Sequence, residues 1–301
     1  MASVRPRGFG GKARASVNRQ LRQVLRTLDL SDNVSCQKLH GTGNQTWLVG
    51  MGAGQIVVRL DGSETVGFVD RAKEHRHAAI ASSEGFGPQI LLSDPQDGVL
   101  VTRYVEGRRL DEGVRPLTAE LMRRLVCQLA RLQSCSGFGG LMDPWAKVKL
   151  YLDDAGIDDP SAAGAFGHLW SRVQSLEGVA CLDNRTLVPC HVDLVPQNLI
   201  DTGECVFLVD WEYAALSSPL WDAAYFAVET GLDSEELALW RRQVTDVLDV
   251  DTADFLNWMA VAMSVSLAWC LARQRRDQSS GDDWRVEIDR RRSELAEFLG
   301  V

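Results

Sequence analysis

The first hundred residues alternate short apolar segments with glycine-rich turns. Three such segments lie at about 34–40, 45–50 and 55–61, and the turns between them contain Gly41-Thr-Gly43-Asn44 and Gly50-Met-Gly52-Ala-Gly54. Short apolar runs joined by glycine turns predict an antiparallel meander. Around the meander, the pattern predicts helices at 17–29 and 67–83 and further strands at 89–93 and 98–104.

Beyond residue 104 the apolar positions recur at helical spacing. Within 118–133, Leu121, Leu125, Leu129 and Leu132 share one face of a predicted helix. Further helices are predicted at 145–155, 162–177, 219–231, 234–248, 252–273 and 283–299, with a strand pair at 188–210. The pattern therefore predicts an α+β protein whose sheet lies at the beginning of the chain and whose helices follow.

The change of pattern near residues 104–107 divides the chain into three predicted parts. Residues 1–28 form a basic tail and a leading helix, 29–104 form a small lobe with an antiparallel sheet, and 105–301 form a larger, mostly helical lobe. The tail has seven basic residues and no acid before residue 27. Such a stretch is also typical of a transit peptide or a polyanion-binding arm, but a frayed tail is the commoner case.

Composition excludes several classes of protein. The net charge of −9 argues against a general nucleic-acid binder, which would be basic. The longest apolar stretch, Met259 to Leu271, is interrupted by two serines and predicts no membrane span. Seven cysteines without a CxxC pair, and no apolar signal-peptide core, indicate reduced thiols in a cytoplasmic protein. The oligomeric state stays open, a homodimer included.

The strongest chemical signal is His191-Val-Asp193-Leu-Val-Pro-Gln-Asn198, followed by an apolar strand and Asp210-Trp211-Glu212. Phosphoryl transfer from ATP needs a group that aims the acceptor hydroxyl and ligands that hold Mg²⁺. Asp193 fits the first role, and Asn198 and Asp210 offer oxygens for the metal. His191 is expected to anchor the loop by hydrogen bonds rather than to transfer protons.

The spacing of these residues resembles the catalytic core of the aminoglycoside phosphotransferase and choline kinase-like family. The shared pattern is His-x-Asp-x-x-x-x-Asn, then a strand and Asp-Trp-Glu. The resemblance covers most of residues 34–230. It implies a bilobal protein-kinase-like fold, with ATP and Mg²⁺ as cofactors and a small alcohol as acceptor.

The nucleotide side is predicted from the small lobe. Gly41, Gly43 and Asn44 form a turn whose backbone N–H groups can approach phosphate oxygens, although such a turn is often only structural. Arg59 ends the third strand and is expected to hold phosphates, paired with Glu74; Glu64 and Glu84 are weaker partners. The resemblance implies that backbone groups from Arg103 to Val105 bind adenine.

The acceptor is predicted to be a small cationic alcohol. The motif Arg-x-x-Gly-x-x-Thr, with Arg-x-x-Glu after it, favours a choline or ethanolamine kinase. Asp-Trp-Glu-Tyr-Ala favours thiamine kinase almost equally, and an aminoglycoside comes third because the last helix carries four arginines. Glu212, Trp211 and Asp222 are assigned to acceptor binding, with carboxylates and aromatic faces holding the cation. Asp222 also has a structural interpretation, either as a brace for the catalytic loop or as a charge at the N-terminus of its helix.

Three other classes compete with this interpretation. A non-catalytic nucleotide-binding protein with a kinase-like fold is disfavoured because every expected polar position of the catalytic loop is filled. A protein kinase is disfavoured by the lack of Asp-Phe-Gly and Ala-Pro-Glu and by the ten residues between Asp210 and Leu220-Trp221. A scaffold without enzymatic activity is disfavoured because it would not require this spacing of polar residues.

Overall fold

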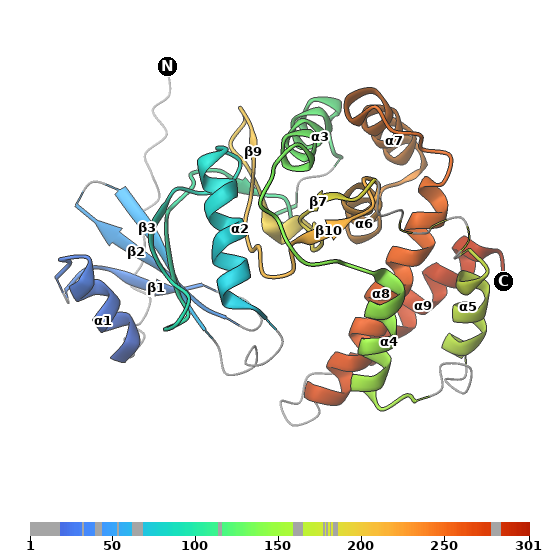
Figure 1. Cartoon of the computed structure of the whole chain (residues 1–301), viewed down its shortest axis with the longest axis horizontal. Coiled ribbons are helices and arrows are strands. Elements are labelled where there is room, and N and C mark those ends of the chain that lie inside the picture. The colour runs from blue at the N-terminus through green and yellow to red at the C-terminus, as the bar shows by residue number, and fades with distance from the viewer. Residues whose placement is uncertain are drawn as a thin grey trace, which may run out of the picture. The chain divides into compact units, whose positions relative to one another are not determined.

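The structure, a computed structural model, divides into two compact units (Figure 1). The described residues are 19–301, except for 32, 40–43, 53, 62–68, 114–115, 159–164, 177, 179, 181, 183–185 and 278–283. The N-terminal unit takes in the chain to His75 and Gln89–Tyr104, and the C-terminal unit takes in Arg76–Pro88 and Val105–Val301. The basic residues before Arg19 lie outside the described residues.

The N-terminal unit is built on a five-stranded antiparallel sheet in the order β1-β2-β3-β5-β4. Its elements are α1 (Arg19–Thr27), β1 (Cys36–Lys38), β2 (Gln45–Met51), β3 (Gly54–Leu60), β4 (Ile90–Asp94), β5 (Val99–Arg103) and the first turn of α2 (Arg71–Ser83). Alternate residues of β3 are fully buried, namely Ile56, Val58 and Leu60. They form one apolar core with Leu21 and Leu25 of α1. The amphipathic pattern of the first helix is therefore satisfied by the sheet.

The close approach of the end of β3 to the turn between β4 and β5 depends on one glycine. The Asp61 N–H donates to the carbonyl of Gly98 at 3.1 Å, and a Cβ built on Gly98 would lie 2.2 Å from Asp61 Oδ2. Gly98 also has a φ of 60°, which favours glycine. Any side chain at this position would therefore displace Asp61.

The C-terminal unit contains most of the helices and two small sheets. Its elements include β6 (Arg108–Arg109), α3 (Ala119–Gln133), α4 (Pro144–Ala155), α5 (Ala165–Gln174), β7 (Val188–Cys190), a 3-10 turn (Pro196–Asn198), β8 (Leu199–Asp201), β9 (Val206–Leu208), β10 (Ala215–Ser217), α6 (Trp221–Thr230), α7 (Ser234–Leu248), α8 (Phe255–Arg276) and α9 (Arg285–Leu299). Strand β8 pairs with β6 and β9, and β7 pairs with β10, all antiparallel. Helix α8 packs against α4, α6 and α9 (Figure 1).

Helix α8 corrects the prediction that no apolar run is long enough to cross a membrane. Its 22 residues are apolar and long enough to do so by length and composition alone. However, 72% of its most apolar window is buried inside the protein. Core helices of globular proteins are buried in the same way. Helix α8 is such a helix, since α4, α6 and α9 all pack against it.

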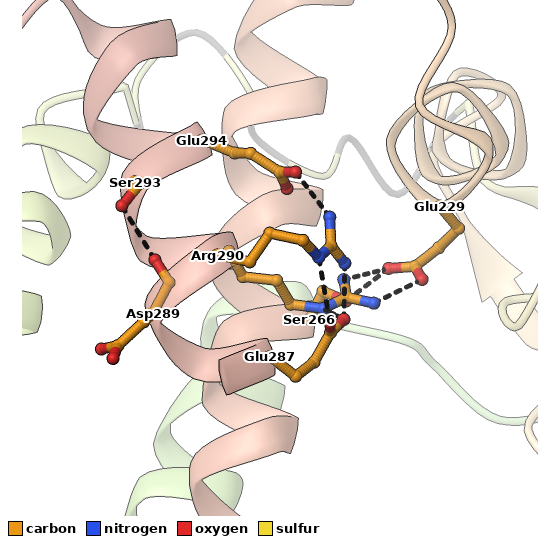
Figure 2. Close-up of polar contacts among 8 residues, drawn as sticks. Glu229, Ser266, Glu287, Asp289, Arg290, Ser293 and Glu294 are labelled. Carbon is orange, nitrogen blue, oxygen red and sulfur yellow. Dashed lines mark hydrogen bonds and ion pairs between the residues drawn. The ribbon is translucent and has the colours of Figure 1, made fainter. Parts of the chain in front are cut away.

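A salt bridge ties α9 to α6, and a hydrogen bond ties it to α8 (Figure 2). Arg291 makes a bidentate contact with Glu229 of α6, at 2.7 and 2.9 Å, and both side chains bond to Ser266 of α8. Arg290 bonds to Glu287 and Glu294 on its own helix. Arg290, Arg291 and Arg292, which were counted against an aminoglycoside acceptor, bond to carboxylates. They are therefore weaker evidence against that acceptor than their number suggests.

Most of the predicted helices and strands are confirmed, with boundaries shifted by a few residues. The strand pair predicted at 188–210 is instead three strands, of which β8 pairs with β9 while β7 pairs with β10. Two further short strands were not predicted. β6 has two residues and β10 has three, and each is defined by pairing with a strand far away in the sequence. Such pairing leaves no local periodicity from which it could be predicted.

We expect Leu129→Ala to lower the free energy of unfolding by about 2–5 kcal/mol, because it leaves a cavity in a fully buried position of α3. Urea unfolding followed by circular dichroism measures the change. Cys127→Ala on the exposed side of the same helix is the control and should change the value by less than about 0.5 kcal/mol. Equal effects of the two changes would contradict the assignment of the core face.

Candidate active site

The loop that follows β7 has an unusual backbone. Val192, between His191 and Asp193, has a φ of 73°, which a β-branched residue rarely adopts. Such a conformation costs on the order of 1–3 kcal/mol and persists only where neighbouring groups hold it. The strain therefore indicates that the loop is fixed by its surroundings.

Asp222, at the start of α6, holds this loop. Its Oδ2 accepts the N–H of His191 at 2.7 Å, and its Oδ1 accepts the N–H of Val192 at 2.8 Å. The indole N–H of Trp221 donates to the Val192 carbonyl at 3.1 Å. Burial raises the pKa of Asp222 to about 7, while the two N–H donors lower it.

This geometry corrects one of the two interpretations of Asp222. Its side chain is buried at 1% exposure, and each oxygen already accepts a backbone N–H. A carboxylate in this position braces the loop that carries Asp193 and has no exposed oxygen to offer a ligand.

Asp193 and Asn198 lie against each other within the loop. The Asn198 Nδ2 donates to the backbone carbonyl and to Oδ2 of Asp193, both at 3.0 Å. With its amide hydrogens directed at Asp193, Asn198 can offer a metal only its Oδ1. Burial, and after it the charges of Glu229 and Glu212, raises the pKa of Asp193 to about 7.

His191, which directly follows β7, is fully buried. Its Nε2 lies 2.9 Å from the carbonyl oxygen of Val209, so this nitrogen carries the proton. Burial lowers the pKa of His191 to about 4, which leaves the ring neutral near pH 7. The ring packs on Trp211 with centroids 4.7 Å apart.

Trp211 also lies in the interior, and this corrects its assignment to acceptor binding. The residue is 3% exposed and packs against Phe86 and Phe138 as well as His191. Trp211 therefore supports the loop from the protein interior, by packing against His191.

Asp210 follows β9 and has a φ of 68°, the second strained position near the motif. An aspartate tolerates the left-handed region better than most residues do. The donor set of Asn198 Oδ1 and the Asp210 carboxylate fits Mg²⁺, which prefers oxygen ligands and keeps several waters. Glu212 is half-buried two residues further on.

In the N-terminal unit, Arg59 at the end of β3 forms an ion pair with Glu74 of α2. Glu64, one of the weaker candidates for this pair, lies outside the described residues. Burial opposes ionisation of Glu74, but the nearby guanidinium groups of Arg59 and Arg71 lower its pKa below the usual value. Glu74 is therefore ionised near neutral pH.

Arg71 joins this pair to the glycine turn, a role the sequence did not predict. Its guanidinium contacts Glu74 Oε2 at 2.6 Å, Asp61 Oδ1 at 2.8 Å and Asn44 Oδ1 at 2.9 Å. Asn44 is thus anchored to α2, while Gly41 and Gly43 lie outside the described residues. The Arg-x-x-Glu spacing at 71–74 was a signal for this contact, since residues three apart share a helix face.

The segment expected to bind adenine follows β5. Arg103 is exposed, and its backbone N–H and side chain both donate to Gln89, at 2.8 Å each. Tyr104 donates its N–H to the Gln55 carbonyl at 3.0 Å. Val105 comes next and is half-buried.

Two tyrosines are coupled electrostatically to Asp193, whereas tryptophans of the later helices lie in the core. Trp221, Trp240 and Trp258 are core residues, and Arg273 lies over the rings of Trp269 and Trp284. By contrast, the pKa values of Tyr151 and Tyr213 are raised by burial and by the charges of Asp193 and Glu212. The position of Tyr213 directly after Asp-Trp-Glu was the signal that sequence reasoning left unused.

The fold and this geometry agree with a known class of protein. Residues 36–256 match the model of the phosphotransferase enzyme family, and the chain belongs to that family. It is 25% identical over 209 residues to Protein LicA of Haemophilus influenzae, covering 67% of this chain and 60% of LicA. It is 29% identical over 178 residues to ethanolamine kinase 2 of Mus musculus, covering 56% of this chain and 45% of that protein.

A solved structure supports the fold. Choline kinase LicA from Streptococcus pneumoniae matches with a TM-score of 0.78 at 21% identity, covering 95% of this chain and 99% of that chain. The predicted family and the kinase-like α+β fold are therefore confirmed. The chain spans only 60% and 45% of the lengths of the two curated relatives.

We expect Asp222→Ala to lower the free energy of unfolding by about 3–6 kcal/mol, because hydrogen bonds to charged groups contribute about 1.5–3 kcal/mol each and two are lost. Turnover should fall as well, since the loop loses its brace. Urea unfolding and steady-state kinetics measure the two effects. Asp246→Ala on the exposed face of α7 is the control; if both changes had the same small effect, Asp222 would not brace the loop.

Proposed function

We propose that this protein is an ATP- and Mg²⁺-dependent kinase that phosphorylates the hydroxyl group of a small amino alcohol of the choline and ethanolamine class. The observation that carries the proposal is the contact of Asn198 Nδ2 with Asp193 Oδ2, in a strained loop braced by Asp222. It aims a half-buried carboxylate and an amide oxygen in a way that suits phosphoryl transfer. Family membership and the similarity to LicA and to an ethanolamine kinase support it.

In this proposal Asp193 orients the acceptor hydroxyl. The hydroxyl oxygen forms a bond to the γ-phosphorus as the bond to the bridging oxygen of ADP breaks, and Asp193 accepts the hydroxyl proton. Positioning matters most, because the loose transition state does not need early deprotonation. His191 is buried and neutral. Its hydrogen bond to the Val209 carbonyl anchors the loop, and it transfers no proton.

Asn198 and Asp210 would hold Mg²⁺ through Asn198 Oδ1 and the Asp210 carboxylate. When bound, the metal neutralises charge on the phosphate oxygens. Asn198 and Asp210 must hold their oxygens in fixed positions. The left-handed φ of Asp210 fixes its carboxylate, and the two hydrogen bonds to Asp193 fix the Asn198 side chain.

On the nucleotide side, Arg59 would contact phosphate oxygens while Glu74 fixes the direction of its guanidinium. Asn44, anchored by Arg71, would support the turn of Gly41 and Gly43 against the phosphates. Backbone groups of Arg103 to Val105 would bind adenine. These roles follow the arrangement expected of kinase-like enzymes.

The proposed acceptor site is based on the negative charge of Glu212. Glu212 lies next to the tyrosines and acts electrostatically on both Asp193 and Tyr213, so it would bind the ammonium group of the acceptor. A carboxylate beside aromatic rings suits a small cation. Thiamine and the aminoglycosides, which are larger cationic alcohols, are the alternatives that the acceptor screen below includes.

We also propose a cytoplasmic location. The described cysteines all carry free thiols: Cys36, Cys127, Cys135, Cys190, Cys205 and Cys270. Burial raises the pKa of Cys190, next to His191, well above its ordinary value, so this thiol stays protonated. Free thiols in this number are typical of a reducing compartment, where ATP is also abundant.

We expect kcat/KM to fall as the pH drops through about 7. The pKa of Asp193 is raised to about 7, and only the ionised carboxylate accepts the proton, so activity rises with pH and levels off above that value. Glu229→Gln removes a like charge and should move the acidic limb to lower pH. A pH–rate profile of both proteins measures this; an unshifted limb would show that Glu229 does not act on Asp193.

Release of ADP from Mg·ATP with choline, ethanolamine, thiamine or kanamycin tests the proposed reaction. Choline or ethanolamine should stimulate release, and Asp193→Ala should reduce it by about 10²–10⁴-fold while the protein stays folded. Asp210→Ala should raise the Mg²⁺ concentration needed for half-maximal rate. Stimulation by kanamycin or thiamine alone, or full activity of both variants, would overturn the acceptor class or the residue roles respectively.

A further inference from the structure

Lys147 of α4 places its ammonium group over two tyrosine rings. Its Nζ lies 5.0 Å from the ring centroid of Tyr151 and 4.8 Å from that of Tyr213. Lys147 and Tyr151 are four residues apart, so they share one face of α4. Both distances are within the range of a cation–π contact. An ammonium group of the protein itself thus lies at a two-tyrosine site.

This two-tyrosine site is close to the catalytic loop. Tyr213 belongs to the segment that begins with Asp210, and the charges of Asp193 and Glu212 act on both tyrosines. The charge of Lys147 in turn acts on Asp193. The two-tyrosine site therefore belongs to the charged surroundings of the carboxylate that we propose orients the acceptor hydroxyl.

Methylated and primary ammonium groups use such a site differently. A trimethylammonium group has no N–H to donate, so it depends on aromatic faces and on long-range attraction to carboxylates. A primary ammonium group has three N–H donors and can bond directly to a carboxylate such as Glu212. An alcohol of the first kind needs the ring faces that Lys147 covers, whereas one of the second kind does not.

We propose that Lys147 is a specificity residue that disfavours quaternary ammonium alcohols and favours primary amino alcohols as acceptors. A quaternary head group would have to displace the Lys147 ammonium from the two rings, and two cations at one site repel each other. A primary ammonium group bonds to the carboxylates and leaves Lys147 in place. This inference rests on the proposed function and narrows its acceptor class.

Steady-state kinetics with Mg·ATP test the inference, using ethanolamine and choline as acceptors for four proteins. The wild-type protein should have the higher kcat/KM for ethanolamine. Lys147→Ala should raise the ratio of kcat/KM for choline to that for ethanolamine about tenfold or more, which corresponds to about 1.4 kcal/mol. Lys147→Arg keeps a cation over the rings and should retain the wild-type ratio.

Lys149→Ala is the matched control. Lys149 is exposed on the same helix and pairs with Asp153 at 2.9 Å, so its loss should leave the ratio unchanged. Thermal unfolding of all variants shows whether each is folded. A ratio that stays within twofold of wild type in Lys147→Ala, or a wild-type preference for choline, would overturn the role of Lys147. If neither acceptor stimulates ADP release in the wild-type protein, the proposed function itself fails.

Discussion

The active site depends on one carboxylate that accepts two adjacent backbone N–H groups. Asp222 bonds to the N–H groups of His191 and Val192, and this offsets the cost of the left-handed φ at Val192. Bonds to a charged acceptor are about twice as strong as neutral ones, so two of them suffice. The direction of the Asp193 side chain is consequently fixed from α6, about thirty residues further along the chain. The catalytic geometry is a property of tertiary packing as much as of the motif.

That dependence explains what the sequence could predict and what it could not. The helices and the antiparallel sheet follow from apolar periodicity and glycine turns, and the spacing of Asp193, Asn198 and Asp210 was sufficient to indicate phosphoryl transfer. The sequence could not show that Asp222 bonds to the loop. An aspartate at the start of a helix is also favourable simply as a negative charge near the positive end of the helix dipole. Trp211 was misassigned for a similar reason, since an aromatic residue beside a motif has no local sign of burial.

Charge around Asp193 is arranged over several helices. Burial raises its pKa most and Glu229 and Glu212 raise it further, whereas Asn198 and Lys147 lower it. The ionisation of one carboxylate therefore depends on residues of α4, α6 and the segment after β9. Glu229 is itself held by Arg291. A pair of this kind, largely removed from water, contributes little net stability but is costly to break on one side. The local charge therefore changes little unless α9 is displaced.

The family match ends at residue 256, one residue after α8 begins at Phe255. Helix α8 is the element against which α4, α6 and α9 pack, and α9 supplies the partner of Glu229. The segment that carries the recognisable motifs is therefore not a self-sufficient folding unit. A fragment cut at the boundary of the motif-bearing region would expose the apolar faces of α4 and α6 and leave a buried carboxylate without its counter-charge. In this chain the end of the family match and the end of the cooperatively packed unit fall at different places.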